Sequence, residues 1–283
     1  MLKKQLIAVA ATLSGLALGM MSVRANAQAP AAASLHLLQP GTLTVCSDLS
    51  NPPAEGVEDD GKTPKGAAID VVRGLGKTLG LKTEIDNYQF SGIFAALDTG
   101  KCDMIMASLG KTPQRAERYG MVDYWSVASG LLVRTGNPYH MTKFEDLSGH
   151  RVSALLGSRN ASVVKQISDT LVSQGKKPID IVLMSTYVAA FQDLMLGRVD
   201  ALAADTVVIN YFNKQGRGKL EVGGVPIPPK TWSMAMLKTN SGLKDALTAG
   251  IDKMNQDGAM LAITKKWGIN TGVGLCDSSH PCE

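Results

Sequence analysis

The sequence is poor in aromatic residues, in cysteine and in charge. Aromatic residues make up 5% of the 283 residues, charged residues make up 19%, and there are four cysteines. Four cysteines are too few to hold together a disulfide-based scaffold of this length. The four histidines are scattered and none has a partner at metal-ligand spacing, so we predict no metal site. Beyond residue 21 no apolar run is long enough to span a bilayer.

The composition is that of a folded protein. Apolar residues make up 45% of the chain, which excludes a largely disordered polymer. The length suggests about two domains at roughly 150 residues each. The net charge of +4 could point to nucleic acid or to an anionic membrane, depending on where the charge lies.

Residues 1–27 have the pattern of a secretory signal peptide. Lys3 and Lys4 precede an apolar run from Leu6 to Met21, and Ala25-Asn26-Ala27 supplies the small residues of a cleavage site. The run is shorter than the ~20 residues that a membrane anchor needs. Cleavage after Ala27 removes three positive charges and lowers the net charge from +4 to +1. We therefore predict a periplasmic protein and no nucleic-acid partner.

Export would place the cysteines in an oxidising compartment. Cys276 and Cys282 lie six residues apart in a polar tail with Pro281 between them, and we predict a local disulfide. Cys46 and Cys102 lie in strand-like segments. Buried thiols are the simpler interpretation for this second pair, and a second disulfide is the alternative.

Strand-like and helix-like segments alternate after a polar leader at residues 28–40. The expected strands are residues 42–46, 82–85, 103–107, 131–133, 152–156, 179–184, 199–204 and 234–237. The expected helices are residues 69–79, 90–97, a segment opening at Thr112-Pro113, and residues 161–174, 189–196, 207–214 and 243–267. This alternation predicts an α/β protein with mostly parallel sheets covered on both faces.

One unit occurs twice. Residues 97–103 and 194–200 share a helix end, a glycine, a basic residue and an aspartate, each followed by a strand that ends at Ser108 or at Asp205. In open α/β sheets, ligands bind outside the carboxyl ends of the strands. We therefore expect two lobes that face each other, with Ser108 and Asp205 lining the gap.

Several motifs occur in a characteristic order between about residues 41 and 270. They are Gly66-x-x-Ile69-Asp70-Val71, Gly100-Lys101-x-Asp103, Ser108-x-x-x-Thr112-Pro113-x-Arg115, Leu147-Ser148-Gly149-x-x-Val152, Gly157-Ser158, Gly197-Arg198-Val199-Asp200-Ala201 with Asp205, Asp257-Gly258 and Lys265-Lys266-Trp267-Gly268. In this order and spacing the chain resembles the family 3 extracellular solute-binding proteins of ABC importers, the periplasmic polar amino-acid binding proteins.

The resemblance implies a type II periplasmic-binding-protein clamshell. Lobe 1 would comprise residues 41–133 plus 237–270 and lobe 2 residues 138–232, with two hinge strands between them and a C-terminal tail at 271–283. The implied function is to capture a polar amino acid or a derivative and deliver it to a membrane permease. The protein would be a monomer without a cofactor and not an enzyme. The alternative on the same fold is an enzyme similar to cyclohexadienyl or arogenate dehydratases, and a receptor sensor domain is a third possibility.

The resemblance also implies the binding residues. Arg115 matches the arginine that binds the ligand carboxylate, and Asp205 matches the acid that binds the ammonium group. Residues 157–159 would begin a helix whose free N–H groups suit an anion. The full predicted set is Asp48, Asn51, Phe90, Ser108, Gly110, Arg115, Leu155, Gly157, Ser158, Arg159, Asn160 and Asp205.

Simpler interpretations stand beside these roles. Taken alone, Arg115 would be a solvated helix residue, Asp205 a helix N-cap and Asp48 a turn residue. Phe90 could pack at a helix end instead of on the ligand.

The chain also departs from the family pattern. Asn51 and Ala54 stand where aromatic residues are usual, which implies a roomier or differently shaped side-chain pocket, and Ala107 stands where serine is common. Arg159 would suit an acidic ligand side chain and Asp48 a basic one, and the sequence leaves both open.

Overall fold

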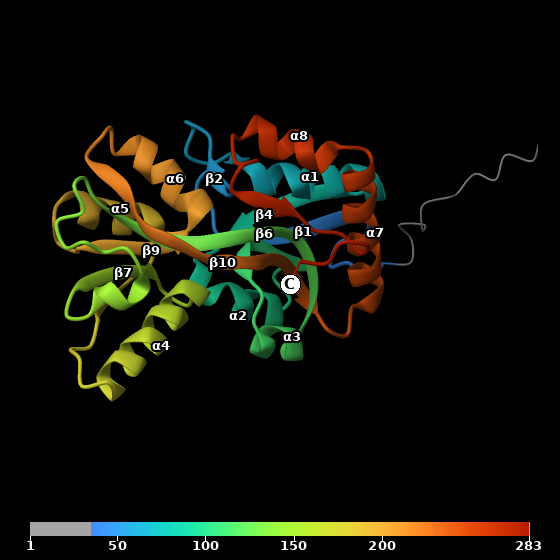
Figure 1. Ribbon diagram of the computed structural model, residues 1–283. Helices are drawn as coiled ribbons and strands as arrows, with labels where there is room; N and C mark the ends of the chain where they lie inside the picture. The colour runs from blue at the N-terminus through green and yellow to red at the C-terminus, as the bar shows by residue number, and fades with distance from the viewer. Residues whose placement is uncertain (1–34, 283) are drawn as a thin grey trace, which may run out of the picture.

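The computed structural model describes residues 35–282, without the side chains of residues 225–228. The predicted signal peptide and most of the predicted leader lie outside the described residues. Within them the chain forms one nine-stranded sheet flanked by helices, together with a two-stranded hairpin (Figure 1). The strand order of the sheet is β4-β1-β5-β10-β6-β9-β7-β8, and β11 pairs with β6.

The first half of the sheet is built from strand–helix units near the N-terminus. Its elements are β1 (Thr42–Ser47), β2 (Gly56–Val57), β3 (Pro64–Lys65), α1 (Ala67–Leu79), β4 (Lys82–Asn87), η2 (Phe90–Gly92), α2 (Ile93–Asp98), β5 (Met104–Gly110) and α3 (Pro113–Arg118). β1 pairs in parallel with both β4 and β5, so the carboxyl ends of these strands share one edge.

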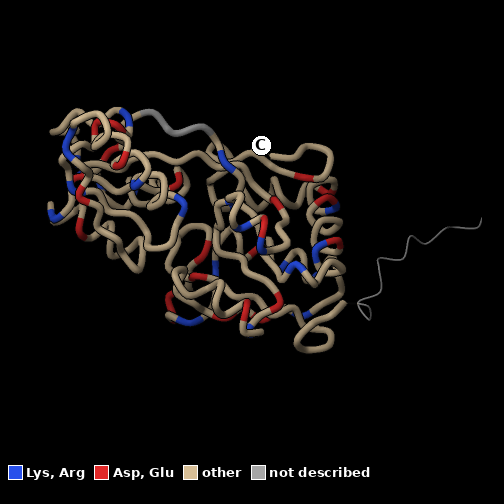
Figure 2. Tube along the Cα trace, turned by 90° about the horizontal axis from the view of Figure 1, so that it is seen from below, with Lys and Arg blue, Asp and Glu red and all other residues tan. Residues whose placement is uncertain are grey.

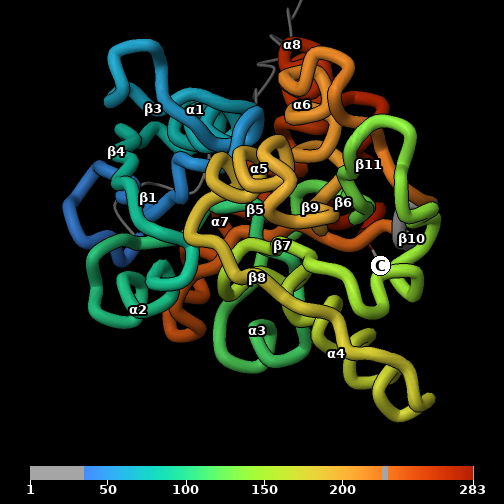
Figure 3. The backbone as a smooth tube through the Cα atoms, turned by 90° about the vertical axis from the view of Figure 1, so that its left-hand side faces the viewer, coloured from blue at the N-terminus to red at the C-terminus, as the bar shows by residue number. Residues whose placement is uncertain are grey.

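The second half repeats this plan. Its elements are η3 (Phe144–Leu147), β7 (Arg151–Leu155), α4 (Arg159–Ser173), β8 (Asp180–Met184), α5 (Tyr187–Met195), β9 (Ala201–Asp205) and α6 (Thr206–Gln215). β7 pairs in parallel with β8 and β9. Figure 3 looks onto this half, with α4 and α5 on opposite sides of β7 and β8.

Two long antiparallel strands join the halves. β6 (Tyr119–Arg134) and β10 (Leu220–Leu237) pair with each other, β10 also pairs with β5, and β6 also pairs with β9. Both are much longer than the short strands expected at 131–133 and 234–237, because each runs through both halves. α7 (Ser241–Gln256) and α8 (Ala259–Lys266) then return to pack against α1.

We call β1, β4, β5, α1, α2, α7 and α8 lobe 1, and β7, β8, β9, α4, α5 and α6 lobe 2. Lobe 1 thus contains chain from before β6 and from after β10, as a clamshell with two crossing strands requires. The residue boundaries between the lobes stay a prediction, because β6 and β10 belong to both.

Three buried aromatic residues lie together where the long strands cross. Tyr124 and Trp125 of β6 and Trp232 of β10 are buried, with ring centroids 5.1–6.4 Å apart. Large rings at this spacing bury much apolar surface and hold the two strands together. The indole of Trp232 also reaches a carboxylate of the site described below.

The expectation of free buried thiols at Cys46 and Cys102 is wrong, because these residues form a disulfide. β1 and β5 are neighbouring parallel strands, with Val45 opposite Met104. This pairing brings the two cysteine Cα atoms to 5.6 Å, within the usual range for a disulfide, despite their 56-residue separation in sequence.

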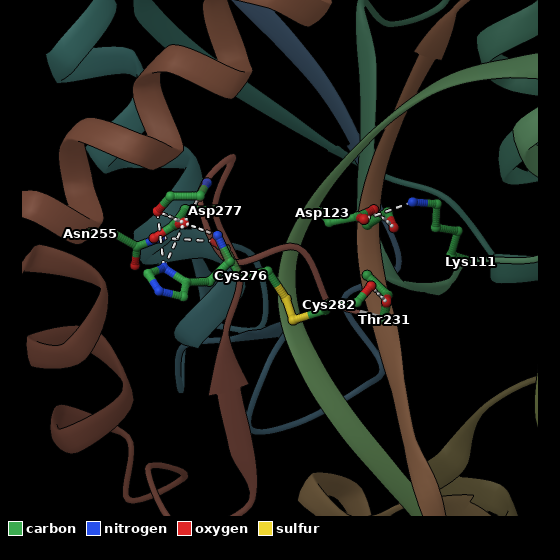
Figure 4. Close-up of a disulfide and its surroundings, with 10 residues drawn as sticks. Lys111, Asp123, Thr231, Asn255, Cys276, Asp277 and Cys282 are labelled. Atoms are coloured by element: carbon green, nitrogen blue, oxygen red, sulfur yellow. Dashed lines mark hydrogen bonds and ion pairs between the residues drawn. A yellow bond between two sulfur atoms is a disulfide. The ribbon is translucent and has the colours of Figure 1, made fainter.

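The predicted disulfide between Cys276 and Cys282 is present (Figure 4). It follows β11 (Val273–Leu275), which pairs with β6. The Thr231 hydroxyl donates to the Cys282 carbonyl at 2.8 Å, so the tail contacts both long strands.

Positive and negative residues are interspersed over both lobes (Figure 2). In the part of the chain that the structure describes, no helix has both the length and the apolar character needed to cross a membrane.

Candidate functional site

A pocket of about 350 Å³, including space open to solvent, lies between the lobes, where strands from each side end. β5, the loop after β1 and the start of η2 bring residues from lobe 1, and β7, β9 and the starts of α4 and α5 bring residues from lobe 2. The pocket is lined by Asn51, Phe90, Ala107, Ser108, Gly110, Leu155, Ser158, Arg159, Asn160, Tyr187 and Asp205. Nine of the twelve predicted site residues are therefore brought together here, and the other three are Asp48, Arg115 and Gly157.

Asp205 is the last residue of β9 and is held by three neutral donors. Its Oδ1 accepts from the Ser129 hydroxyl at 2.8 Å and from Asn160 Nδ2 at 3.0 Å. Its Oδ2 accepts from Trp232 Nε1 at 2.8 Å. The side chain makes no capping hydrogen bond to α6, so the N-cap alternative does not explain it. A buried carboxylate fixed by donors from β6, α4 and β10 is suited to bind a cation.

Arg159 and Asn160 begin α4, which Ser158 caps by accepting from the Ala161 N–H at 3.1 Å. Arg159 is 9% exposed, and its Nη1 donates to the Ser129 hydroxyl at 3.3 Å. Its Nε and Nη2, and the Asn160 Oδ1, have no hydrogen-bond partner among the described residues. Because buried guanidinium N–H groups without an acceptor are costly, Arg159 Nε and Nη2 are suited to an anionic ligand group, whereas the Asn160 Oδ1 is an acceptor and is suited to a ligand N–H.

Arg115 lies at the mouth of the gap and does not line the inner pocket. Thr112 caps α3 by accepting from the Arg115 N–H, as the Thr-Pro motif predicts. The Arg115 guanidinium donates from Nη1 to the Gly110 carbonyl at 2.7 Å and from Nη2 to the Gly157 carbonyl at 3.1 Å. It also lies over the rings of Phe90 and Phe94. Arg115 therefore bridges the two lobes, and its predicted contact with a ligand carboxylate stays a prediction.

The lobes contact each other around the pocket. A Cβ placed on Gly157, whose φ is +78°, would lie 3.6 Å from Ser91 Cα of lobe 1. A Cβ placed on Gly110 of lobe 1 would lie 3.0 Å from Arg159 Cδ of lobe 2. These close approaches indicate a closed arrangement, in which Gly110 leaves space for the Arg159 side chain.

Glu55 is a buried acid of the site that the sequence did not reveal. Ser108 Oγ lies 2.8 and 2.9 Å from its two carboxylate oxygens, and Asn51 Nδ2 donates to Oε2 at 2.8 Å. Glu55 is fully buried, and this burial raises its pKa to about 8. Its contacts orient two pocket residues and leave the Asn51 Oδ1 without a partner among the described residues.

The loop that carries Asp48 lies behind the pocket. Asp48 Oδ1 accepts from the Ser50 N–H and hydroxyl at 3.0 and 2.7 Å, and Oδ2 accepts from the Phe90 N–H at 3.2 Å. These bonds match the turn-residue alternative for Asp48. They also hold Phe90, which does line the pocket.

Three other residues of the site were missed. Tyr187 at the start of α5 lines the pocket, and Ser129 and Trp232 hold Asp205 from the two long strands. Burial raises the pKa of the Tyr187 hydroxyl far above its ordinary range, so the phenol stays neutral. None of the three belongs to a local motif, and each is brought to the site by strand pairing or helix packing.

Comparison with known proteins identifies the family. Residues 43–270 match the model for bacterial extracellular solute-binding proteins, family 3. The protein belongs to this family, as the motif order predicted, and has its clamshell fold.

The relatives are similar over most of their length. The L-cystine-binding protein TcyJ of Escherichia coli (strain K12) is 26% identical over 229 residues, which cover 80% of this chain and 82% of the relative. The arginine-binding protein ArgT of Corynebacterium glutamicum is 26% identical, with coverages of 84% and 77%. An ancestral arginine-binding protein bound to arginine has a TM-score of 0.75 and 29% identity, and covers 80% of this chain and 98% of its own.

Proposed function

We propose that this protein captures a polar amino acid between its lobes in the periplasm and delivers it to the membrane permease of an ABC importer. The observation that carries the proposal is the pairing of Asp205 with Arg159 across one pocket. Asp205 offers an acceptor of fixed orientation for an ammonium group, and Arg159 offers free donors for a carboxylate. A free amino acid brings both groups, and each loses water when the lobes close.

Asp205 and Arg159 both belong to lobe 2, so closure depends on further contacts of the ligand with lobe 1, whose Ser108 and Gly110 also line the pocket. Each lobe contributes part of the pocket, so a ligand that touches both lobes stabilises the closed state over the open one. The names of the relatives, which bind cystine or arginine, support an amino acid as the ligand.

Calorimetry of Asp205→Asn tests the proposal. The change keeps the side-chain size but removes the charge, and we expect amino-acid affinity to fall by about 10- to 100-fold, as for the loss of one charge-assisted hydrogen bond. Asp169→Asn, on the exposed surface of α4, is the matched control and should bind like the parent. Undiminished binding by Asp205→Asn would refute the assignment of Asp205 to the ammonium group, and the absence of amino-acid binding by the parent would refute the proposed function.

An enzyme on this fold is the second candidate. A structural neighbour with 26% identity and a TM-score of 0.72 is described as an ancestral amino acid-binding protein that is a precursor of cyclohexadienyl dehydratase. That neighbour is itself a binding protein, so we propose that this chain binds its ligand without converting it. Incubation with arogenate or prephenate should give no turnover, and product formation would support the enzyme instead.

A further inference from the structure

An open hollow lies beside the inner pocket, between α3 and α4. Its volume is about 1140 Å³, including space open to solvent. Arg159 borders both the pocket and the hollow, while Arg115, Lys111 and Lys230 line the hollow alone. A ligand group that Arg159 binds in the pocket would therefore lie next to the hollow.

Positive charge dominates these two spaces. Among the residues that line them, the cationic side chains are Lys111, Arg115, Arg159 and Lys230, and the carboxylate is Asp205. Lys111 is paired with Asp123, which lies 2.7 Å away. Within the described residues, the other three cations form no ion pair with a carboxylate.

The nearby acids do not offset this charge. Asp205 is held by the neutral donors of Ser129, Asn160 and Trp232. Glu55 lies behind Ser108, and because its pKa is about 8 it is mostly uncharged at pH 7.

The cations also affect one another. Burial, and next the positive charge of Arg159, lower the pKa of Arg115, and the same two causes lower the pKa of Lys230. The Nε and Nη2 of Arg159 are buried without an acceptor.

An anion placed among Arg159, Arg115 and Lys230 would relieve the repulsion between these cations and would supply the missing hydrogen-bond acceptors. An amino acid with a neutral side chain supplies one carboxylate together with an ammonium group. The positive charge of Arg115, Arg159 and Lys230 would then stay in excess.

We propose that the ligand is an amino acid with a second anionic group, its ammonium group at Asp205 and its two anionic groups among Arg159, Arg115 and Lys230. This inference rests on the proposed function and narrows its substrate class. The predicted ligand differs from that of the arginine-binding relatives, because the same three cations would repel the guanidinium group of arginine.

Calorimetry with matched amino acids tests the inference. L-glutamate and L-glutamine have nearly the same shape, and so do L-aspartate and L-asparagine, and L-arginine serves as the cationic probe. We expect one acidic amino acid to bind at least about tenfold more tightly than its amide, and arginine to bind more weakly than both. Lys230→Met should weaken binding of the acid by about fivefold to tenfold and leave binding of the amide unchanged. Lys77→Met, on the exposed surface of α1, is the charge-matched control.

The outcomes separate this inference from the proposed function. Tighter binding of an amide or of arginine would overturn the anionic preference while the amino-acid function stands. Equal affinity of Lys230→Met and the parent for the acid would also overturn it. Binding of none of the five would overturn the anionic preference, and binding of another polar amino acid in the same assay would show that the proposed function stands. A melting curve for each variant confirms folding, and Arg159→Met, which keeps the aliphatic part of the buried side chain, should weaken binding of the acid and of its amide, because both carry the carboxylate that Arg159 holds.

Discussion

Glu55→Gln is expected to change how stability depends on pH. The carboxyl group is fully buried against Ser108 and Asn51, and its pKa is raised from an ordinary value of 4.5 to about 8. The folded state therefore binds a proton more tightly than the unfolded state. This contribution to stability is fully present below about pH 4.5 and is lost as the pH rises to about 8. The slope is about 1.4 kcal/mol per pH unit, and the total over the interval is about 5 kcal/mol.

Urea unfolding of both proteins between pH 5 and pH 9 measures this effect. Glutamine is close in shape to the protonated acid and does not titrate, so the free energy of unfolding of the parent minus that of the variant isolates Glu55. We expect this difference to fall steadily from pH 5 to about pH 8 and then to level off. A flat difference, or one that rises with pH, would refute the conclusion that Glu55 is protonated in the folded protein at neutral pH.

Two further predictions concern packing and the long-range disulfide. Gly110→Ala places a Cβ 3.0 Å from Arg159 Cδ, so calorimetry should show amino-acid affinity about tenfold weaker, whereas Gly92→Ala, which meets no atom within 4 Å, should bind normally. Equal affinities would contradict the packing of Arg159 over Gly110. Replacing both Cys46 and Cys102 by serine removes a link across 56 residues and should lower the free energy of unfolding by about 4 kcal/mol. Loss of the tail disulfide, which spans six residues, should cost about 2 kcal/mol by the same relation, and an equal or larger loss there would contradict the expectation.

The fold class and the centre of the site follow from patterns along the chain. Alternating strands and helices predicted a parallel α/β fold, and two polar strand ends, Ser108 and Asp205, predicted where the lobes face each other. Both residues do line the pocket. These predictions succeeded because the end of a strand can be recognised from the local sequence. Parallel pairing then places the carboxyl ends of neighbouring strands at the same edge of the sheet.

The missed features depend on contacts between distant residues. Glu55 meets Ser108 across 53 positions, and Trp232 meets Asp205 across 27, with no local spacing to indicate either contact. Their burial is decided by tertiary packing, which a single sequence does not show. The disulfide of Cys46 with Cys102 was discounted for the same reason, because it depends on β1 lying beside β5.

The central claim is that Asp205 and Arg159 hold the two charged ends of an amino acid. The most direct measurement is mass spectrometry of the molecule that stays bound when the protein is purified from its own host and is released by mild denaturation. We predict an α-amino acid, about one per protein chain, that carries a second anionic group. A bound molecule without an ammonium group or without a carboxylate would contradict the account.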